Sequence, residues 1–133
     1  MITGNKMVGE IAAELTEISL PNMASALQTI YRSDDYNKMD HLAFLNAIVT
    51  PEYDAKMEKR LSNRLDNANL KGCPQEISKC VNSADREYKP DGITDTLRTL
   101  DFIDTGLNVC ILGASDSGKS YLAKALALHA CTR

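Results

Sequence analysis

The sequence has no tryptophan, and five tyrosines and two phenylalanines are its only aromatic residues among 133 positions. A packed core must therefore be built mainly from leucine, isoleucine, methionine and alanine. No run of about 18 apolar residues occurs, which argues against a membrane-spanning helix. The first residues also lack the apolar stretch of a signal peptide. The net charge of −3 gives no overall attraction for DNA.

Metal-ligand and disulfide patterns are also missing. The cysteines and histidines are Cys73, Cys80, Cys110, Cys131, His41 and His129. No C-x-x-C pair is among them and the histidines lie far away in sequence, so we expect no zinc site. Such cysteine usage fits a reducing cytoplasm. Cys110 lies within an apolar run, and we expect it to be a small core residue.

Residues 113–120 carry the most informative pattern. They read Gly-Ala-Ser-Asp-Ser-Gly-Lys-Ser, a full match to the phosphate-binding loop G-x-x-x-x-G-K-[ST]. The apolar run 108–112 before them predicts a buried strand, and 121–130 predict a helix with Leu122, Ala125, Leu126 and His129 on one face. Strand, glycine loop and helix form the setting that this motif requires.

The chemistry of such a loop comes from its main chain. Successive N–H groups form a nest for anions at a helix N-terminus. Lys119 would reach the β- and γ-phosphates, and the Ser120 hydroxyl would ligate Mg²⁺. The sequence thus predicts a nucleoside triphosphate and Mg²⁺ as ligands; the nucleotide contacts are Gly113, Ala114, Ser115, Asp116, Ser117, Gly118, Lys119, Ser120 and Tyr121. The alternative is a Gly/Ser turn that binds nothing.

Asp116 is the unusual member of the loop. A carboxylate roughly 5 Å from a phosphate is repelled by about 3 kcal/mol per unit charge before screening. Bound Mg²⁺ would offset part of this. Aspartate accepts a positive φ better than most residues, so we expect the curled main chain to survive while the affinity falls.

Apolar periodicity divides the chain into three parts. Residues 1–71 predict a helical interaction domain: a helix over 7–18, a second from Pro21, a third from about 37, and either a fourth from Pro51 or a bend there. Residues 72–92 predict a linker with one short strand near 77–81. Residues 93–133 begin with a helix capped by Thr94 that points Ile93, Leu97, Leu100 and Ile103 inward. The run 108–112 has no parallel neighbour, so residues 107–133 rest on the preceding helices, pair with another copy or lack order.

One edge of the predicted fourth helix is basic. Its cations are Lys56, Lys59, Arg60 and Arg64, which are candidate contacts to DNA phosphates. Four carboxylates share the helix and would form surface pairs with them: Glu52, Asp54, Glu58 and Asp66. The balance favours an ordinary solvated face.

The residues around the loop resemble a known family. Segments 101–103 and 108–127 look like the IstB-like ATP-binding proteins, the AAA+ helpers of insertion-sequence transposases, which are similar to DnaC-type helicase loaders. Segments 20–27 and 58–69 resemble that family's N-terminal helical domain. The resemblance implies a mainly α protein in which a helical domain precedes the first strand, P-loop and helix of an incomplete α/β P-loop NTPase (AAA+) domain.

The same resemblance implies an ATPase that assembles on DNA and contacts a transposase or a replicative helicase through its N-terminal helices. It covers about the first half of a family member. Asp116 stands where the family commonly has Gly, and the acidic Walker B position and later elements do not follow within these residues. We therefore expect nucleotide binding at most, without hydrolysis. The alternative is a helical interaction module, or a truncation remnant without nucleotide, that binds a partner or a copy of itself.

Overall fold

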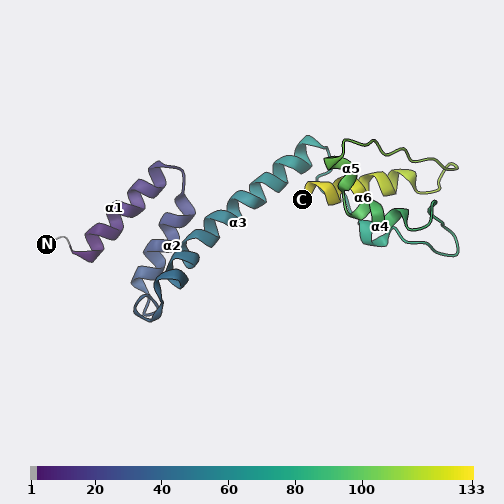
Figure 1. Ribbon diagram of the computed structural model, residues 1–133. Helices are drawn as coiled ribbons and strands as arrows, with labels where there is room; N and C mark the ends of the chain where they lie inside the picture. Colours follow the sequence, from purple (N-terminus) through teal and green to yellow (C-terminus); the bar gives the residue numbers. More distant parts are fainter. Residues whose placement is uncertain (1–2) are drawn as a thin grey trace. The chain divides into compact units, whose positions relative to one another are not determined.

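The computed structural model describes residues 3–133, and it is mainly helical, as predicted (Figure 1). Its helices are α1 (Gly4–Glu17), α2 (Pro21–Arg32), α3 (His41–Asn67), α4 (Ile93–Arg98), α5 (Asp101–Asp104) and α6 (Lys119–Cys131), with 3₁₀ turns η1 (Tyr36–Lys38) and η2 (Ile77–Lys79). The chain divides into two compact units between Arg60 and Leu61. None of the helices in residues 3–133 has the length and apolarity needed to cross a bilayer.

The first unit is a helix-on-helix structure. Helices α1 and α2 pack against each other and bury apolar side chains, Ala12 from α1 and Ala24 with Leu27 from α2. Pro21 is the first residue of α2, as predicted, because its fixed φ suits a helix start and it has no N–H to leave unpaired. Helical periodicity over residues 7–18 places Ile11 and Ile18 on the same apolar face as Ala12, but both isoleucines are exposed.

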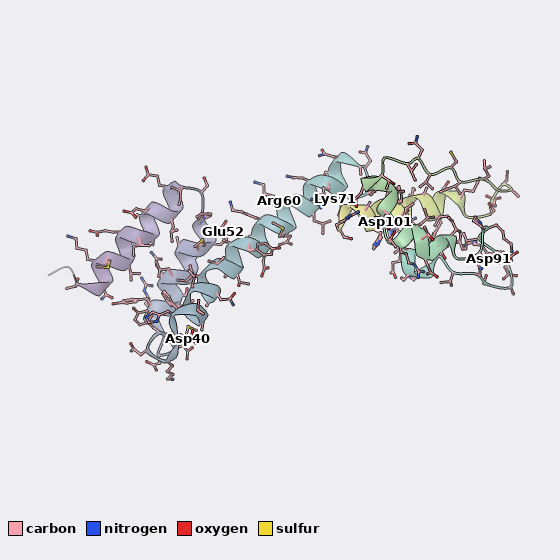
Figure 2. All side chains as sticks on the ribbon, in the orientation of Figure 1. Asp40, Glu52, Arg60, Lys71, Asp91 and Asp101 are labelled. Atoms are coloured by element: carbon pink, nitrogen blue, oxygen red, sulfur yellow. The ribbon has the colours of Figure 1, made fainter. Side chains whose placement is uncertain are left out.

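A buried carboxylate caps α2. Glu52, which lies on α3 and is labelled in Figure 2, is only 6% exposed. Its Oε2 accepts hydrogen bonds from the backbone N–H of Asn22 at 2.8 Å and of Met23 at 3.2 Å. These are first-turn amides without a partner inside the helix. The prediction that Glu52 is an ordinary surface-pair residue is therefore wrong: its ion pair with Lys56, at 3.9 Å, is secondary to the cap.

Helix α3 is one helix with Pro51 inside it, so no separate fourth helix begins at the proline. It starts later than the predicted position near 37. Residues Tyr36–Lys38 form η1 instead, and the Asp40 side chain accepts a 2.7 Å hydrogen bond from the Ala43 N–H. This is the bond of an N-cap aspartate. Its residues up to Arg60 belong to the first unit and those from Leu61 to the second.

The second unit is built around α6. Leu122 and Ala125 pack with Cys80, and Leu126 packs with Leu97 and Leu100. One face of α6 is thus covered by the segments that precede it in sequence, which corresponds to the first of the three predicted alternatives for residues 107–133. The predicted inward positions 122, 125 and 126 are buried, as expected.

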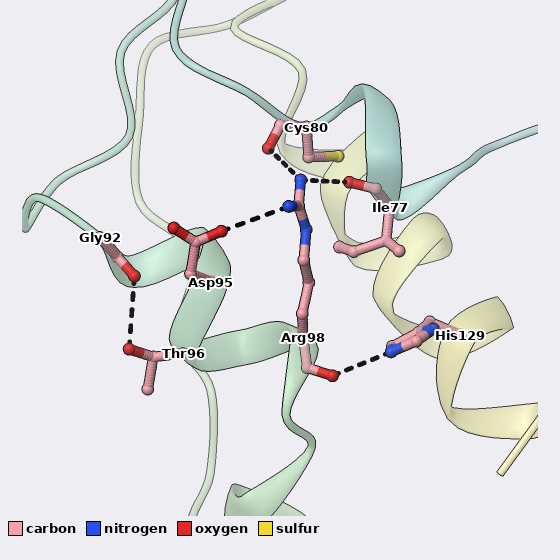
Figure 3. Close-up of polar contacts among 7 residues, drawn as sticks. All are labelled: Ile77, Cys80, Gly92, Asp95, Thr96, Arg98 and His129. Carbon is pink, nitrogen blue, oxygen red and sulfur yellow. Dashed lines mark hydrogen bonds and ion pairs between the residues drawn. The ribbon is translucent and has the colours of Figure 1, made fainter.

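Arg98 connects three pieces of the second unit (Figure 3). Its guanidinium donates hydrogen bonds to the carbonyl oxygens of Ile77 at 3.2 Å and Cys80 at 3.5 Å, and it pairs with Asp95 at 3.2 Å. The Arg98 carbonyl lies 2.9 Å from His129 Nε2. One residue of α4 therefore joins η2 to α6, the helix that follows the glycine loop.

The predicted strands are absent. Within residues 3–133 the structure has no β-strand, only an isolated bridge between Ser83 and Arg86. Residues 77–79 are the 3₁₀ turn η2. The run 108–112 is not buried: Leu112 is 92% exposed, and Cys110 is exposed rather than a core residue. A strand of this kind is buried only between neighbouring strands and beneath covering helices. The described residues contain no neighbouring strand.

The helix predicted after residue 92 is also interrupted. Leu100 has φ 61°, which ends α4 and starts the short α5, so the expected single helix is two. Leu97 and Leu100 are buried as predicted, but Ile103 is 48% exposed. Thr94 is not the cap, because α4 begins at Ile93 after Gly92 in a left-handed conformation.

Candidate functional site

The glycine loop curls tightly at the start of α6. Asp116 and Gly118 both have positive φ, 59° and 90°, and the Ser117 N–H donates to the Ala114 carbonyl at 3.3 Å. The Lys119 ammonium turns back over the loop and donates to the carbonyl oxygens of Gly113 at 2.8 Å and Ala114 at 2.5 Å. The expectation that the main chain remains curled with aspartate at position 116 is confirmed.

A side chain at either motif glycine would approach a neighbouring side chain closely. A Cβ on Gly113 would lie 2.8 Å from the Ser117 Oγ. A Cβ on Gly118 would lie 2.9 Å from the Cζ of Arg86, in addition to the strain of its φ. Gly113 thus permits close approach, and Gly118 permits both close approach and curvature, as a loop that wraps an anion needs.

Two hollows adjoin the loop. One of about 260 Å³ is lined by Gly113, Asp116, Ser117, Gly118 and Lys119 from the loop and by residues 85–88, 111, 112 and 122. The other, of about 320 Å³, is lined only by residues 116–120. Both are close to the lower size of small-molecule pockets. Space for a ligand thus exists on the side of the loop that faces the first turn of α6.

The structure brings most of the predicted nucleotide contacts to these hollows, with three exceptions. Ala114 and Ser115 are exposed on the loop but line neither hollow. Tyr121 faces the other way: it packs against the cluster around Cys80, and its hydroxyl accepts a 3.4 Å hydrogen bond from the Glu76 N–H. Tyr121 therefore packs against the core of the second unit and does not face the two hollows.

Sequence reasoning missed the contribution of residues 85–88 to the site. This segment has no apolar periodicity and was predicted to be linker. Its Arg86 lies against Gly118, and Tyr88 packs on the cluster of Cys80, Leu122 and Ala125. Burial raises the pKa of the Tyr88 phenol. Hydrogen bonds to Glu87 and then Asp91 raise the pKa of the Lys89 ammonium.

The predicted basic edge is not one set of free cations. Lys56 lies 3.9 Å from Glu52 and donates to the Ser19 carbonyl at 3.5 Å, both within the first unit. Arg64, in the second unit, donates to the Cys131 carbonyl at 3.1 Å and so holds the end of α6. Lys59 and Arg60 are exposed. The described residues also contain no cluster of three His, Cys, Asp or Glu side chains able to hold a metal.

The curled loop, its inward lysine and the helix that follows it can be compared with known proteins. The sequence model of the family described as IstB-like ATP binding protein matches residues 13–133. The chain belongs to the IstB-like ATP-binding family. The predicted resemblance is therefore confirmed, and the match includes both the helical part and the glycine loop.

Two relatives of this IstB-like chain come from Sinorhizobium fredii. Both are named as insertion sequence ATP-binding proteins, y4uH at 34% identity over 119 residues and y4pL at 27% over 118 residues. They cover 88% and 89% of this chain, which in turn covers 46% and 47% of them. The chain thus spans about half the length of the curated relatives it matches. No solved structure matches it.

Proposed function

We propose that this IstB-like chain binds ATP through residues 113–120 as a cytoplasmic helper of insertion-sequence transposition. The observation that carries the proposal is the loop itself: it curls with positive φ at Asp116 and Gly118, and the Lys119 ammonium lies over it. In residues 3–133 no side chain accepts a hydrogen bond from the first-turn amides of α6. Those amides remain available to an anion.

The residues present fit a magnesium nucleotide. Main-chain amides of the loop would take the phosphates, Lys119 would neutralise their charge, and Ser120 offers the hydroxyl that Mg²⁺ prefers. Bound Mg²⁺ would supply charge neutralisation. Hydrolysis needs further groups that position water and stabilise the transition state. We therefore assign nucleotide binding, and not hydrolysis, to these 133 residues.

Calorimetric titration of Mg·ATP tests this proposal. We expect the wild-type chain to release or absorb heat and Lys119→Ala to lose at least about 100-fold in affinity, since a charge-assisted contact to each of two phosphates disappears. Lys124→Ala is the matched control, an exposed lysine on the same helix beyond the loop. Equal, negligible heat from the wild type and Lys119→Ala would overturn the proposal.

A second proposal concerns the first unit, which we infer contacts the transposase through α3. Four apolar side chains form one stripe at helical spacing: Leu42, Leu45, Val49 and Tyr53, which are 78%, 55%, 41% and 60% exposed. Exposed stripes of this kind mark interaction surfaces. The relatives' names place them in insertion sequences, so the transposase is the partner that the proposal chooses.

Light scattering coupled to size exclusion, with the purified transposase of the same element, tests the stripe. We expect Leu42→Asp with Val49→Asp to abolish the complex. Leu112→Asp, which charges an exposed leucine in the second unit, is the control and should leave it intact. A complex unaffected by the double variant would refute the assignment. A stripe-dependent homodimer, or binding to a replicative helicase instead, would replace the transposase as occupant.

A further inference from the structure

We propose that Arg86 is a second phosphate-binding cation of the glycine loop, supplied from outside the motif; this rests on the proposed function. Its guanidinium lies directly over Gly118, the residue before the motif lysine. The position of a Cβ on Gly118 would be 2.9 Å from the Arg86 Cζ and 3.0 Å from its Nη2. The absence of a side chain at position 118 is what lets the guanidinium come this close.

The main chain around Arg86 is fastened on both sides. Ser83 and Arg86 exchange backbone hydrogen bonds of 2.7 and 3.3 Å, which closes a tight turn. Two residues later, the Tyr88 N–H donates to the Asn82 side chain at 2.8 Å, and the Tyr88 ring packs on the core beneath α6. Arg86 is therefore presented to the loop by a fixed turn, although its side chain is exposed.

The Arg86 side chain is free to contact an anion. Within residues 3–133 the Arg86 guanidinium has no carboxylate partner at ion-pair distance, whereas the neighbouring Lys89 pairs with Glu87 at 2.7 Å and Asp91 at 3.1 Å. Arg86 and Lys119 line the same hollow of about 260 Å³, together with the carboxylates of Asp85, Glu87 and Asp116. Glu87 is already neutralised by Lys89.

Arg86 also has a role that follows from Asp116. The Asp116 carboxylate lowers the attraction of the loop for polyphosphate. The Arg86 guanidinium, which lies over Gly118 two residues later, would restore that attraction. Guanidinium groups recognise phosphate by two parallel hydrogen bonds, which a lysine cannot reproduce. We assign Arg86 to the phosphates rather than to the base or sugar, because Gly118 and Lys119 beside it belong to the phosphate-binding part of the motif.

Titrations of the full chain with Mg·ATP, ADP, AMP and inorganic tripolyphosphate test the assignment. We expect Arg86→Ala to lose about tenfold or more in affinity for ATP and tripolyphosphate, less for ADP, and nothing measurable for AMP. Arg86→Lys should recover only part of the loss. Lys79→Ala, an exposed cation of the second unit that pairs with Glu76 and does not line the hollow, should bind ATP as the wild type does.

The outcomes separate the two proposals. If the wild type binds ATP, Lys119→Ala does not, and Arg86→Ala binds like the wild type, the assignment of Arg86 is wrong while nucleotide binding stands. If Lys79→Ala weakens binding as much as Arg86→Ala, the effect is one of general charge and the assignment is also wrong. If the wild type gives no heat with either ATP or tripolyphosphate, both proposals fall. The melting temperature of ligand-free Arg86→Ala should match the wild type.

Discussion

Helices α2 and α6 begin in opposite ways. The first-turn amides of α2 are taken by a carboxylate of the same chain, the buried Glu52, at 2.8 and 3.2 Å. The first turn of α6 follows a glycine loop, and no side chain within residues 3–133 accepts its N–H groups. Every helix N-terminus carries unpaired donors and a partial positive charge. In α2 the fold supplies the anion, and in α6 we propose that a nucleotide does.

The largest effect is expected from removing the Glu52 carboxylate, which caps α2. Glu52→Ala should lower the free energy of unfolding by about 2–4 kcal/mol, because two first-turn amides lose a charged acceptor. Glu52→Gln keeps one acceptor and should cost less. Urea denaturation followed by circular dichroism measures both. Glu58→Ala is the control, on the same helix and exposed; a loss as large as that of Glu52→Ala would deny the cap its role.

The glycine at the start of α6 can be tested in the same units. Gly118→Ala should cost about 1–3 kcal/mol in unfolding free energy, since φ is +90° and the new Cβ meets Arg86 at 2.9 Å. Adding Arg86→Ala should recover the part caused by the contact and leave the part caused by φ. Thermal melting of the two single variants and the double variant gives the coupling. Strict additivity would show that the arginine yields freely.

Asp116 sharpens the comparison, because it places a negative charge where an external anion is proposed to bind. Asp116→Gly should raise the affinity for Mg·ATP several-fold, because it removes a repulsion between the carboxylate and the phosphates. Solvent screening keeps this gain modest. The substitution should also ease the main chain at φ 59°. Asp85→Ala, at the edge of the same hollow, is the comparison variant. Unchanged affinity for Asp116→Gly would mean that its carboxylate points harmlessly into water.

The smallest expected effect concerns Tyr88, which packs against the core of the second unit. Burial raises the pKa of Tyr88 above its ordinary value of 10.0, so the neutral phenol favours the folded state. This stability persists below pH 10 and is lost as the pH rises through the raised pKa. Tyr88→Phe should therefore melt with a shallower decline above pH 10, whereas the exposed Tyr53→Phe should follow the wild type. Parallel curves for Tyr88→Phe and wild type would contradict this.

Local rules explain which features the sequence could reveal. Pro21 predicted the start of α2 because proline acts through its own φ and its own missing N–H. The glycine loop was recognisable because its spacing is dictated by backbone geometry. The inward face of α6 followed from helical periodicity. Each of these signals lies within a few residues of the structure that it determines.

Features that depend on distant partners could not be read in this way. The carboxylate of Glu52 looks like any surface acid until α2 is placed beside it. The run 108–112 is apolar enough for a strand, but its burial would depend on neighbours that these residues do not provide. Arg86 had no signal at all, because a single exposed arginine in an aperiodic segment becomes relevant only when the fold lays it on Gly118.

The lysine of the loop carries one more implication. Its ammonium donates hydrogen bonds to the carbonyl oxygens of Gly113 and Ala114. Under the proposed function, capture of a phosphate would replace these partners rather than add new ones. The loop should therefore keep the same curvature with and without a ligand. In the proposed site, the carbonyl oxygens of the loop itself hold the Lys119 ammonium over the loop, where the phosphates would bind.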